Sequence, residues 1–189
     1  MKILVTGGTG YLGGRIVDYT ARETNNFITI ASRSSVINHL FSNKINYIKI
    51  DWDDDKSILE ITKDIDIVIH LAGMNSQDCA EQPKLAMKVN VTSTRSLIRS
   101  SIRNGVKKFI YISTAHVYKS PLEGYINENT PTENSHPYAK THLLGEQAIL
   151  DESNDQAIQP IILRLSNAFG APMSKEVNCW MLLLNDLCF

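Results

Sequence analysis

A glycine-rich turn near the start of the chain constrains its fold most strongly. Residues 2–6 form a short apolar run, and glycines follow it at the spacing Gly7, Gly10 and Gly13. The first glycine permits a tight exit from a strand, the second lets backbone N–H groups approach a pyrophosphate, and the third lets a helix pack closely on the sheet. Such glycines also occur in turns that bind nothing. The strand pattern before them and the helical pattern after them favour a nucleotide-binding turn.

Composition and charge exclude several other classes of protein. The 189 residues are 43% apolar, enough for the core of one globular domain, and the net charge of −1 gives no electrostatic case for nucleic acid or an anionic membrane. No apolar run approaches the length of a membrane span, and the N-terminus has no apolar leader, so we expect a cytoplasmic location. The odd cysteine count and the histidine spacing predict neither a disulfide framework nor a metal site.

Strand patterns recur along the chain, with helical or loop segments between most of them. The strands are continuous apolar runs, as expected for a parallel sheet covered by helices on both faces. The sequence therefore predicts an α/β fold with a doubly wound parallel sheet, a Rossmann-like NAD(P)-binding domain. The predicted strands span 2–6, 27–32, 46–50, 66–71, 108–113 and 160–165.

Three helices can be placed from their end signals. The acidic run 53–55 is typical of a helix start. A long helix over about 83–104 ends at Asn104 and Gly105, where glycine supplies a left-handed cap. Another helix begins near Pro137 and continues to about residue 150. The long helix carries the apolar residues Leu85, Val89, Leu97, Ile98 and Ile102.

Several further stretches follow the glycine turn in the order found in one enzyme family. With them, the chain resembles the extended short-chain dehydrogenase/reductase superfamily, and within it the NAD-dependent epimerase/dehydratase family. A tyrosine segment, 138–146, falls where that family places Y-x-x-x-K-x-x-x-E. The other matching stretches are 6–13 (TGGTGYLG), Asp51, 70–73 (HLAG), 90–92 (NVT), 113–118 (STAHVY) and 164–172 (RLSNAFGAP).

The resemblance implies a nucleotide-sugar epimerase, dehydratase or oxidoreductase that transfers hydride to or from a nicotinamide. It implies that Tyr138 is the acid/base on a sugar hydroxyl, that Thr114 donates a hydrogen bond to the same oxygen with support from Ser113, and that Asn167 binds substrate. The cofactor-binding residues that it implies are Gly7, Gly10, Tyr11, Leu12, Gly13, Ser32, Arg33, Asp51, Trp52, Leu71, Ala72, Gly73, Asn90, Tyr138 and His142.

One position departs from the family pattern. His142 stands where the family has the lysine that holds the nicotinamide ribose and lowers the pKa of the tyrosine. Lys140 cannot replace it, because a position two residues from Tyr138 lies on the opposite face of a helix. Making a tyrosine a base at pH 7 takes a shift of about three pKa units, or roughly 4 kcal/mol, and a neutral imidazole supplies no charge.

Two other functions stay open beside the enzyme, the first favoured by His142 and the second by the short chain. The first alternative is an NAD(P)-binding module with little or no turnover, such as a sensor or an inactive partner subunit. The second is a reductase of small carbonyl compounds.

The end of the second predicted strand indicates which dinucleotide binds. Relatives that use NAD usually carry Asp or Glu there to accept from the ribose 2′-hydroxyl, whereas Arg or small hydroxyl residues suit a 2′-phosphate. Ser32, Arg33 and Ser34 occupy this position. The sequence thus favours NADP(H) over NAD(H), although Arg33 is equally compatible with a solvated loop arginine.

The last residues and the surface helices lead to two more expectations. We assign 1–172 to the dinucleotide-binding domain and 173–189 to an apolar helical tail, which starts a truncated or missing substrate lobe or mediates association. The resemblance implies a homodimer through helices 83–104 and 137–150.

Overall fold

The computed structural model describes residues 1–33, 44–119, 121–174, 176–177 and 179. Within these residues, six parallel strands form one sheet in the order β3-β2-β1-β4-β5-β6. The six predicted strands are confirmed, and no strand end differs from its prediction by more than one residue. The strands are β1 (Lys2–Thr6), β2 (Phe27–Ser32), β3 (Ile45–Lys49), β4 (Ile67–His70), β5 (Lys108–Thr114) and β6 (Gln159–Leu165).

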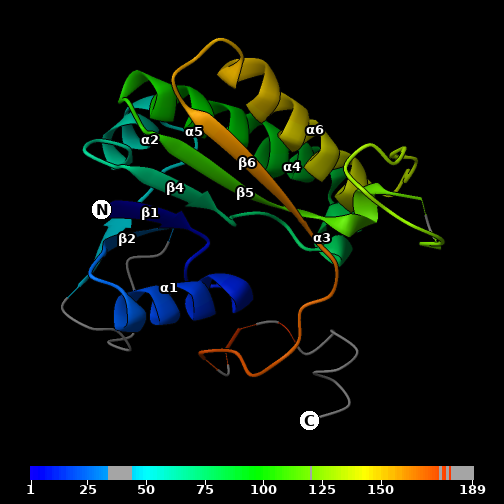
Figure 1. The fold of residues 1–189 in the computed structure, drawn as a ribbon, viewed down its shortest axis with the longest axis horizontal. Helices are drawn as coiled ribbons and strands as arrows, with labels where there is room; N and C mark the ends of the chain where they lie inside the picture. Colours follow the sequence, from blue (N-terminus) through cyan, green and yellow to red (C-terminus); the bar gives the residue numbers. More distant parts are fainter. Residues whose placement is uncertain (34–43, 120, 175, 178, 180–189) are drawn as a thin grey trace.

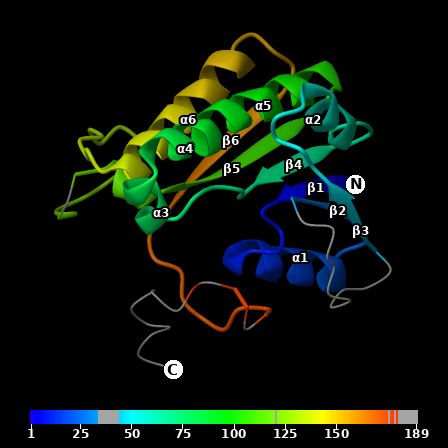
Figure 2. The ribbon, with the colours of Figure 1, turned by 180° about the vertical axis from the view of Figure 1, so that it is seen from behind.

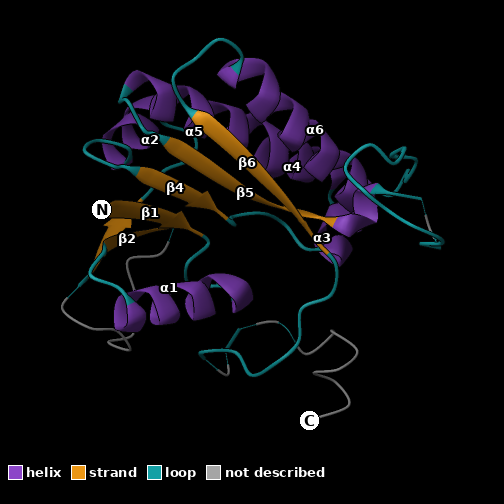
Figure 3. Cartoon of the chain, in the orientation of Figure 1, coloured by secondary structure: helices purple, strands orange, loops and turns teal. Residues whose placement is uncertain are grey.

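Helices lie on both faces of this sheet, which confirms the doubly wound α/β fold (Figures 1 and 3). Helix α1 covers the face at β1 and β2, and the other helices pack on the opposite face, as the view from behind also shows (Figure 2). Asp54 caps the start of α2, and Gly105 follows α5 with φ of +71°, as predicted. The helices are α1 (Tyr11–Glu23), α2 (Asp55–Ile61), α3 (Ser76–Glu81), α4 (Pro83–Met87), α5 (Ser93–Arg103) and α6 (Pro137–Ser153).

Two apolar cores hold the layers together. The smaller core fills the space between the sheet and α1, where Val17 and Ala21 meet Ile3, Val5 and the buried residues of β2. The larger core lies between the sheet and the helices α2, α5 and α6, and it includes Leu97, Ile98, Phe109 and Ile149. Both faces of the central strands are therefore buried, which explains why these strands read as continuous apolar runs.

The predicted helix over 83–104 is interrupted. A π-helical turn, η1 (Lys88–Thr92), separates α4 from α5 and contains the buried Asn90. Turns of this kind are rare and often mark functional sites. Ala86 and Asn90 take the buried positions of this stretch, and Leu85 is 42% exposed.

The segment after β6 returns across the sheet edge to the start of α1 (Figure 1). The Tyr11 phenol donates a hydrogen bond to the Gly170 carbonyl at 3.0 Å, and Met173 packs on Gly14. Most of the predicted apolar tail, 173–189, lies outside the described residues. None of the helices in the described ranges is both long enough and apolar enough to span a bilayer.

The strand order places the carboxyl ends of β1 and β4 side by side at the point where the chain reverses its direction of winding. In open α/β sheets, ligands bind in the crevice outside such neighbouring strand ends. The glycine turn follows β1, and 71–75 follows β4. The topology thus brings two of the predicted motifs to one crevice.

Candidate cofactor and active site

The glycine turn has the geometry of an anion-binding site. Gly7 adopts φ of +72°, and a Cβ atom there would lie 2.7 Å from the Ala72 nitrogen. A Cβ on Gly13 would collide with the Gly7 carbonyl, so α1 can pack this closely only against glycine. Helix α1 begins after Gly10 with no side-chain cap. Its first N–H groups are therefore available to an anion such as a pyrophosphate.

Two cavities meet at this turn and share Gly7, Gly10, Leu71 and Gly73 among their walls. The first cavity, of about 370 Å³, contains the predicted catalytic residues Ser113, Thr114, Tyr138 and His142 together with Asn167. The second, of about 800 Å³, lies at the ends of β2 and β3 and contains Ser32, Arg33, Asp51 and Trp52. Each predicted site residue except Asn90 lines one of these two cavities.

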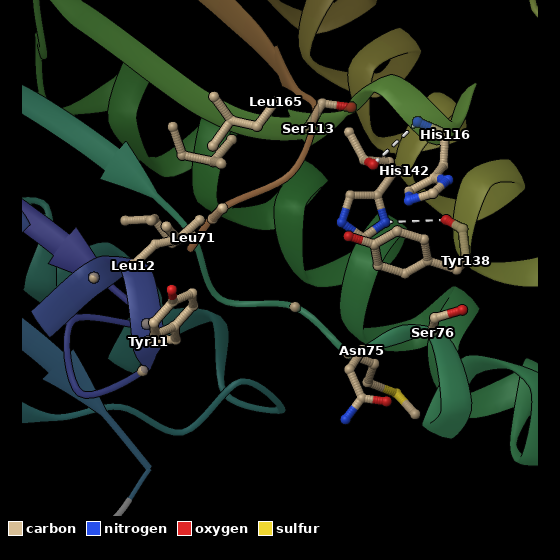
Figure 4. Close-up of a pocket in the computed structure, with 18 of the residues that line it drawn as sticks. Tyr11, Leu12, Leu71, Asn75, Ser76, Ser113, His116, Tyr138, His142 and Leu165 are labelled. Atoms are coloured by element: carbon tan, nitrogen blue, oxygen red, sulfur yellow. Dashed lines mark hydrogen bonds between the residues drawn. The ribbon is translucent and has the colours of Figure 1, made fainter. Parts of the chain in front are cut away.

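Tyr138 and His142 lie side by side at the start of α6 and face the first cavity (Figure 4). Their ring centroids are 4.3 Å apart, and Thr114, at the end of β5, lies near enough to the Tyr138 phenol to act on its pKa. The Thr114 oxygen also accepts a hydrogen bond from the His116 backbone N–H at 3.1 Å. Residues from two elements, β5 and α6, thus form one cluster beside the glycine turn.

The hydrogen bonds of His142 define its tautomer. Its Nδ1 atom lies 3.0 Å from the Tyr138 carbonyl oxygen, which can only accept, so Nδ1 carries the proton. Burial lowers the pKa of His142 to about 4, and the nearby Glu146 opposes this shift only in part. The imidazole is therefore neutral at pH 7, and its unprotonated Nε2 is an acceptor beside Gly73.

Tyr138 retains its proton at neutral pH. Burial raises the pKa of the phenol above its ordinary value, and the hydrogen bond with Thr114 only partly offsets the rise. No lysine or arginine is found among the described residues that line the first cavity. The charge that would lower this pKa is therefore missing there.

Ser113 has a different neighbour from Thr114. Its hydroxyl donates to the Glu146 carboxylate at 2.5 Å, and Arg164 forms an ion pair with that carboxylate at 2.6 Å. Arg164 also donates to the Tyr118 hydroxyl and lies over its ring. These side chains join β5, α6 and β6 behind the cavity. Ser113 therefore connects the end of β5 to the ion pair of Glu146 with Arg164.

Asn90 is 1% exposed and lies behind the cavities. Its Oδ1 accepts from the Met74 backbone N–H at 2.9 Å, and its Nδ2 donates to the Thr141 hydroxyl at 3.0 Å. In this structure Asn90 therefore holds the segment 71–75 and α6 together, beside the residues that line the crevice.

The sequence matches a family model over most of its length. The model of the NAD dependent epimerase/dehydratase family covers residues 3–182. The chain belongs to this family.

Two curated relatives are similar to the chain over about half of their own length. A UDP-glucose 4-epimerase of Halalkalibacterium halodurans is 31% identical over 174 residues, which is 90% of this chain and 52% of the relative. A dTDP-D-glucose 4,6-dehydratase of Mus musculus is 31% identical over 181 residues, which is 89% of this chain and 51% of the relative.

Solved structures of this kind share the fold. A UDP-glucuronic acid 4-epimerase from Bacillus cereus, in complex with UDP-glucuronic acid and NAD, superposes with a TM-score of 0.81 at 23% identity. The match covers 94% of this chain and 60% of that chain. It supports the Rossmann-like architecture found here.

Sequence reasoning missed several residues of this family member's site. One of them is His116, which is exposed in the first cavity, with its ring centroid 6.2 Å from that of Tyr138. Its position three residues after Ser113, in the turn that ends β5, could have indicated this. Met74, Asn75 and Ser76 also line the cavity, because α3 begins there.

An ion pair that the sequence pattern does not reveal lies among the residues that line the second cavity. Lys88 of η1 reaches Asp53 at 2.6 Å, across the opening near Trp52. Both side chains are exposed, so the pair contributes about 0–1 kcal/mol to stability. Across the described ranges, no three His, Cys, Asp or Glu side chains form a group that could hold a metal ion.

Proposed function

We propose that residues 1–172 are the dinucleotide-binding domain of an NAD(P)-dependent epimerase, dehydratase or oxidoreductase that acts on a nucleotide sugar, and that 173–189 begins its substrate lobe. One observation carries the proposal: Tyr138, Thr114 and His142 share a cavity with the glycine turn. The relatives named above act on UDP- and dTDP-sugars, which supports the substrate class.

The cavities suit a nicotinamide dinucleotide. When bound, such a cofactor supplies hydride transfer. The N–H groups at the start of α1 would bind the pyrophosphate, and the residues of the second cavity, among them Asp51 and Trp52, would hold the adenosine half. The residues of the first cavity would hold the nicotinamide half, and the His142 Nε2 would be available to accept a hydrogen bond from a ribose hydroxyl.

The protonation states define the chemistry that these side chains can perform. A phenol that keeps its proton at pH 7 can donate it to a sugar oxygen as hydride arrives at the carbon, and Thr114 donates a second hydrogen bond to that oxygen. In the opposite direction the phenol must first lose its proton. Because burial raises the pKa of Tyr138 and His142 is neutral, little of the phenolate that this direction needs is present at pH 7.

The same observation supports a second candidate, a cofactor-binding module with little turnover. A site that binds dinucleotide through backbone N–H groups does not need a charged residue at position 142. Proton abstraction by Tyr138 does. A positive charge at position 142 should therefore raise the turnover of an enzyme but should give no turnover in a binding module.

His142→Lys separates them. We expect the lysine to raise turnover of UDP-glucose and to move the rise of rate with pH about 1–3 units lower, because a nearby cation stabilises the phenolate. His142→Gln, which is neutral and can hydrogen-bond, is the matched control, and Tyr138→Phe provides the background rate. Rates are measured from pH 6 to 10 at saturating cofactor.

The outcome decides between the candidates. Wild-type turnover above the Tyr138→Phe background that increases with lysine but not with glutamine supports the enzyme. If all variants bind cofactor and none exceeds the Tyr138→Phe background, the binding module is the correct function.

We further propose that the chain prefers NADP(H) to NAD(H). The exposed Arg33 lies at the rim of the second cavity together with Ser32. We expect Arg33→Ala to weaken NADP(H) binding by roughly tenfold or more, as for the loss of a charged hydrogen bond, and to change NAD(H) binding little. Titration followed by reduced-nicotinamide fluorescence measures both, with Lys49→Ala, at the same cavity, as the control. Equal losses for both cofactors would overturn the preference.

We also propose that α5 and α6 form the interface of a homodimer. The two helices pack side by side on the same face of the sheet. Leu150 of α6 is 47% exposed, and the ion pair of Arg99 with Glu152 joins the two helices nearby. A second copy that packs on this surface would cover Leu150.

A further inference from the structure

His70, the last residue of β4, lies among three aromatic rings at the wall of the second cavity. The side chain is 1% exposed, and its ring centroid lies 6.0 Å from that of Trp52, 5.9 Å from that of Phe109 and 5.6 Å from that of Tyr111. A buried imidazole needs a partner for each nitrogen. Both partners are threonine hydroxyls, and their geometry determines the direction of every hydrogen bond around the ring.

The hydrogen bonds form one chain with a single direction. The Thr94 hydroxyl lies 2.9 Å from the Asn90 carbonyl, which only accepts, so Thr94 donates there and its oxygen accepts from His70 Nε2–H at 2.9 Å. His70 Nδ1 is then bare and accepts from the Thr6 hydroxyl at 2.6 Å, while the Thr6 oxygen accepts from the Ala72 backbone N–H at 3.4 Å. Donors and acceptors match only if His70 is the neutral Nε2–H tautomer.

A second set of hydrogen bonds continues from Asn90 to the reactive cluster. The Asn90 amide accepts from Met74 N–H and donates to the Thr141 hydroxyl, which in turn donates to the Tyr138 carbonyl at 3.1 Å. The same Tyr138 carbonyl accepts from His142 Nδ1. The network around His70 is therefore connected, through Asn90 and Thr141, to the start of α6, which carries Tyr138 and His142.

The segment 71–74 is tied to this network at two points, Ala72 and Met74. Between them, Gly73 faces His142: a Cβ on Gly73 would lie 3.2 Å from Asn90 Oδ1 and 3.9 Å from His142 Nε2. The width of the first cavity at His142 thus depends on where the network holds Gly73.

We propose that His70 is a positioning residue: as the neutral Nε2–H tautomer it completes the chain from Ala72 to Asn90 and so fixes the segment 71–74 against His142. The consequence for cofactor affinity rests on the proposed function; the tautomer and the position of His142 do not. Hydrogen bonds that all run in one direction polarise one another, which favours a rigid arrangement.

The first test reads the tautomer directly. Long-range ¹H–¹⁵N NMR of the intact chain distinguishes Nε2–H, Nδ1–H and imidazolium forms of each histidine. We expect His70 to show the Nε2–H form and His142 the Nδ1–H form at pH 7. An Nδ1–H or imidazolium signal for His70 would overturn the proposal without reference to any cofactor.

The second test interrupts the series of hydrogen bonds from Ala72 to Asn90 at defined points. His70→Asn keeps an acceptor near Nδ1, His70→Gln keeps a donor near Nε2, and His70→Leu keeps neither. We expect all three to shift the His142 ¹⁵N resonances, with leucine the most, and to weaken NAD⁺ binding, by roughly tenfold for leucine, the size expected for a lost buried hydrogen bond. Thr94→Val interrupts the same series of hydrogen bonds but retains His70. It therefore provides the test if a His70 variant does not fold.

A matched control separates positioning from general loss of a buried hydroxyl. Ser101→Ala removes a fully buried hydroxyl of α5 that donates only within its own helix, to the Leu97 carbonyl. It should leave the His142 resonances unchanged. If folded Thr94→Val or His70→Leu also leaves them unchanged, His70 does not position the segment. If the wild-type chain binds no dinucleotide but its His142 resonances respond as expected, the proposed function fails and the positioning role stands.

Discussion

Glu146→Ala is expected to lower the free energy of unfolding by about 3–5 kcal/mol. The Glu146 side chain is 4% exposed and accepts hydrogen bonds from Arg164 and Ser113. Its removal leaves the guanidinium, which is 21% exposed, without its counterion in a site that solvent reaches poorly. A buried charge that has lost its partner costs far more than the intact pair contributes. Urea denaturation at pH 7, followed by far-UV circular dichroism, measures the change.

A surface ion pair on the same helix provides the control. Glu152 pairs with Arg99, whose side chain is 59% exposed, so Glu152→Ala should cost less than about 1 kcal/mol. Equal losses from the two variants would show that burial of the Glu146 pair does not govern its energetics. Glu146→Gln, which keeps the volume and some hydrogen bonds, should fall between the two.

The second large effect is loss of stability in mild acid. Burial lowers the pKa of His70 to about 3 and that of His142 to about 4, against about 6.5 in the unfolded chain. Below pH 6.5 the unfolded chain therefore binds protons that the folded chain does not, and stability falls as the pH falls. Each histidine should contribute about 1.4 kcal/mol per pH unit, down to about pH 4 for His142 and about pH 3 for His70.

A variant that removes one of the two groups makes the effect measurable. His142→Gln cannot titrate, so the difference in unfolding free energy between wild type and variant should change by about 1.4 kcal/mol per unit from pH 6 to 4.5. Carboxylates contribute equally to both proteins and cancel in this difference. A difference that is independent of pH would mean that His142 is not held neutral by the fold.

The sequence was sufficient where the structure depends on local pattern. The strands, to within one residue at their ends, the glycine turn, the helix start at the acidic run 53–55 and the glycine after α5 each follow from a few adjacent residues, and the structure confirms them. Most predicted cofactor residues line the two cavities because their motifs end parallel strands, whose carboxyl ends meet at one sheet edge.

What the sequence did not reveal depends on contacts between distant segments. The bond from Ser113 to Glu146 and the bond from Thr6 to His70 join residues 33 and 64 positions apart, so no local spacing predicts them. The π-helical turn at Asn90 exists in a stretch whose periodicity is compatible with a regular helix. The Asn90 side chain is satisfied by Met74 and Thr141, which are tertiary contacts.

The contact between Tyr11 and Gly170 also bears on the order in which the molecule assembles. These residues are 159 positions apart, whereas β1 pairs with β2 across a single short helix. Closing a longer loop costs more chain entropy, and distant pairings form later in folding. We therefore expect a nascent chain to build its central strands first and to cover the start of α1 only after β6 has joined the sheet.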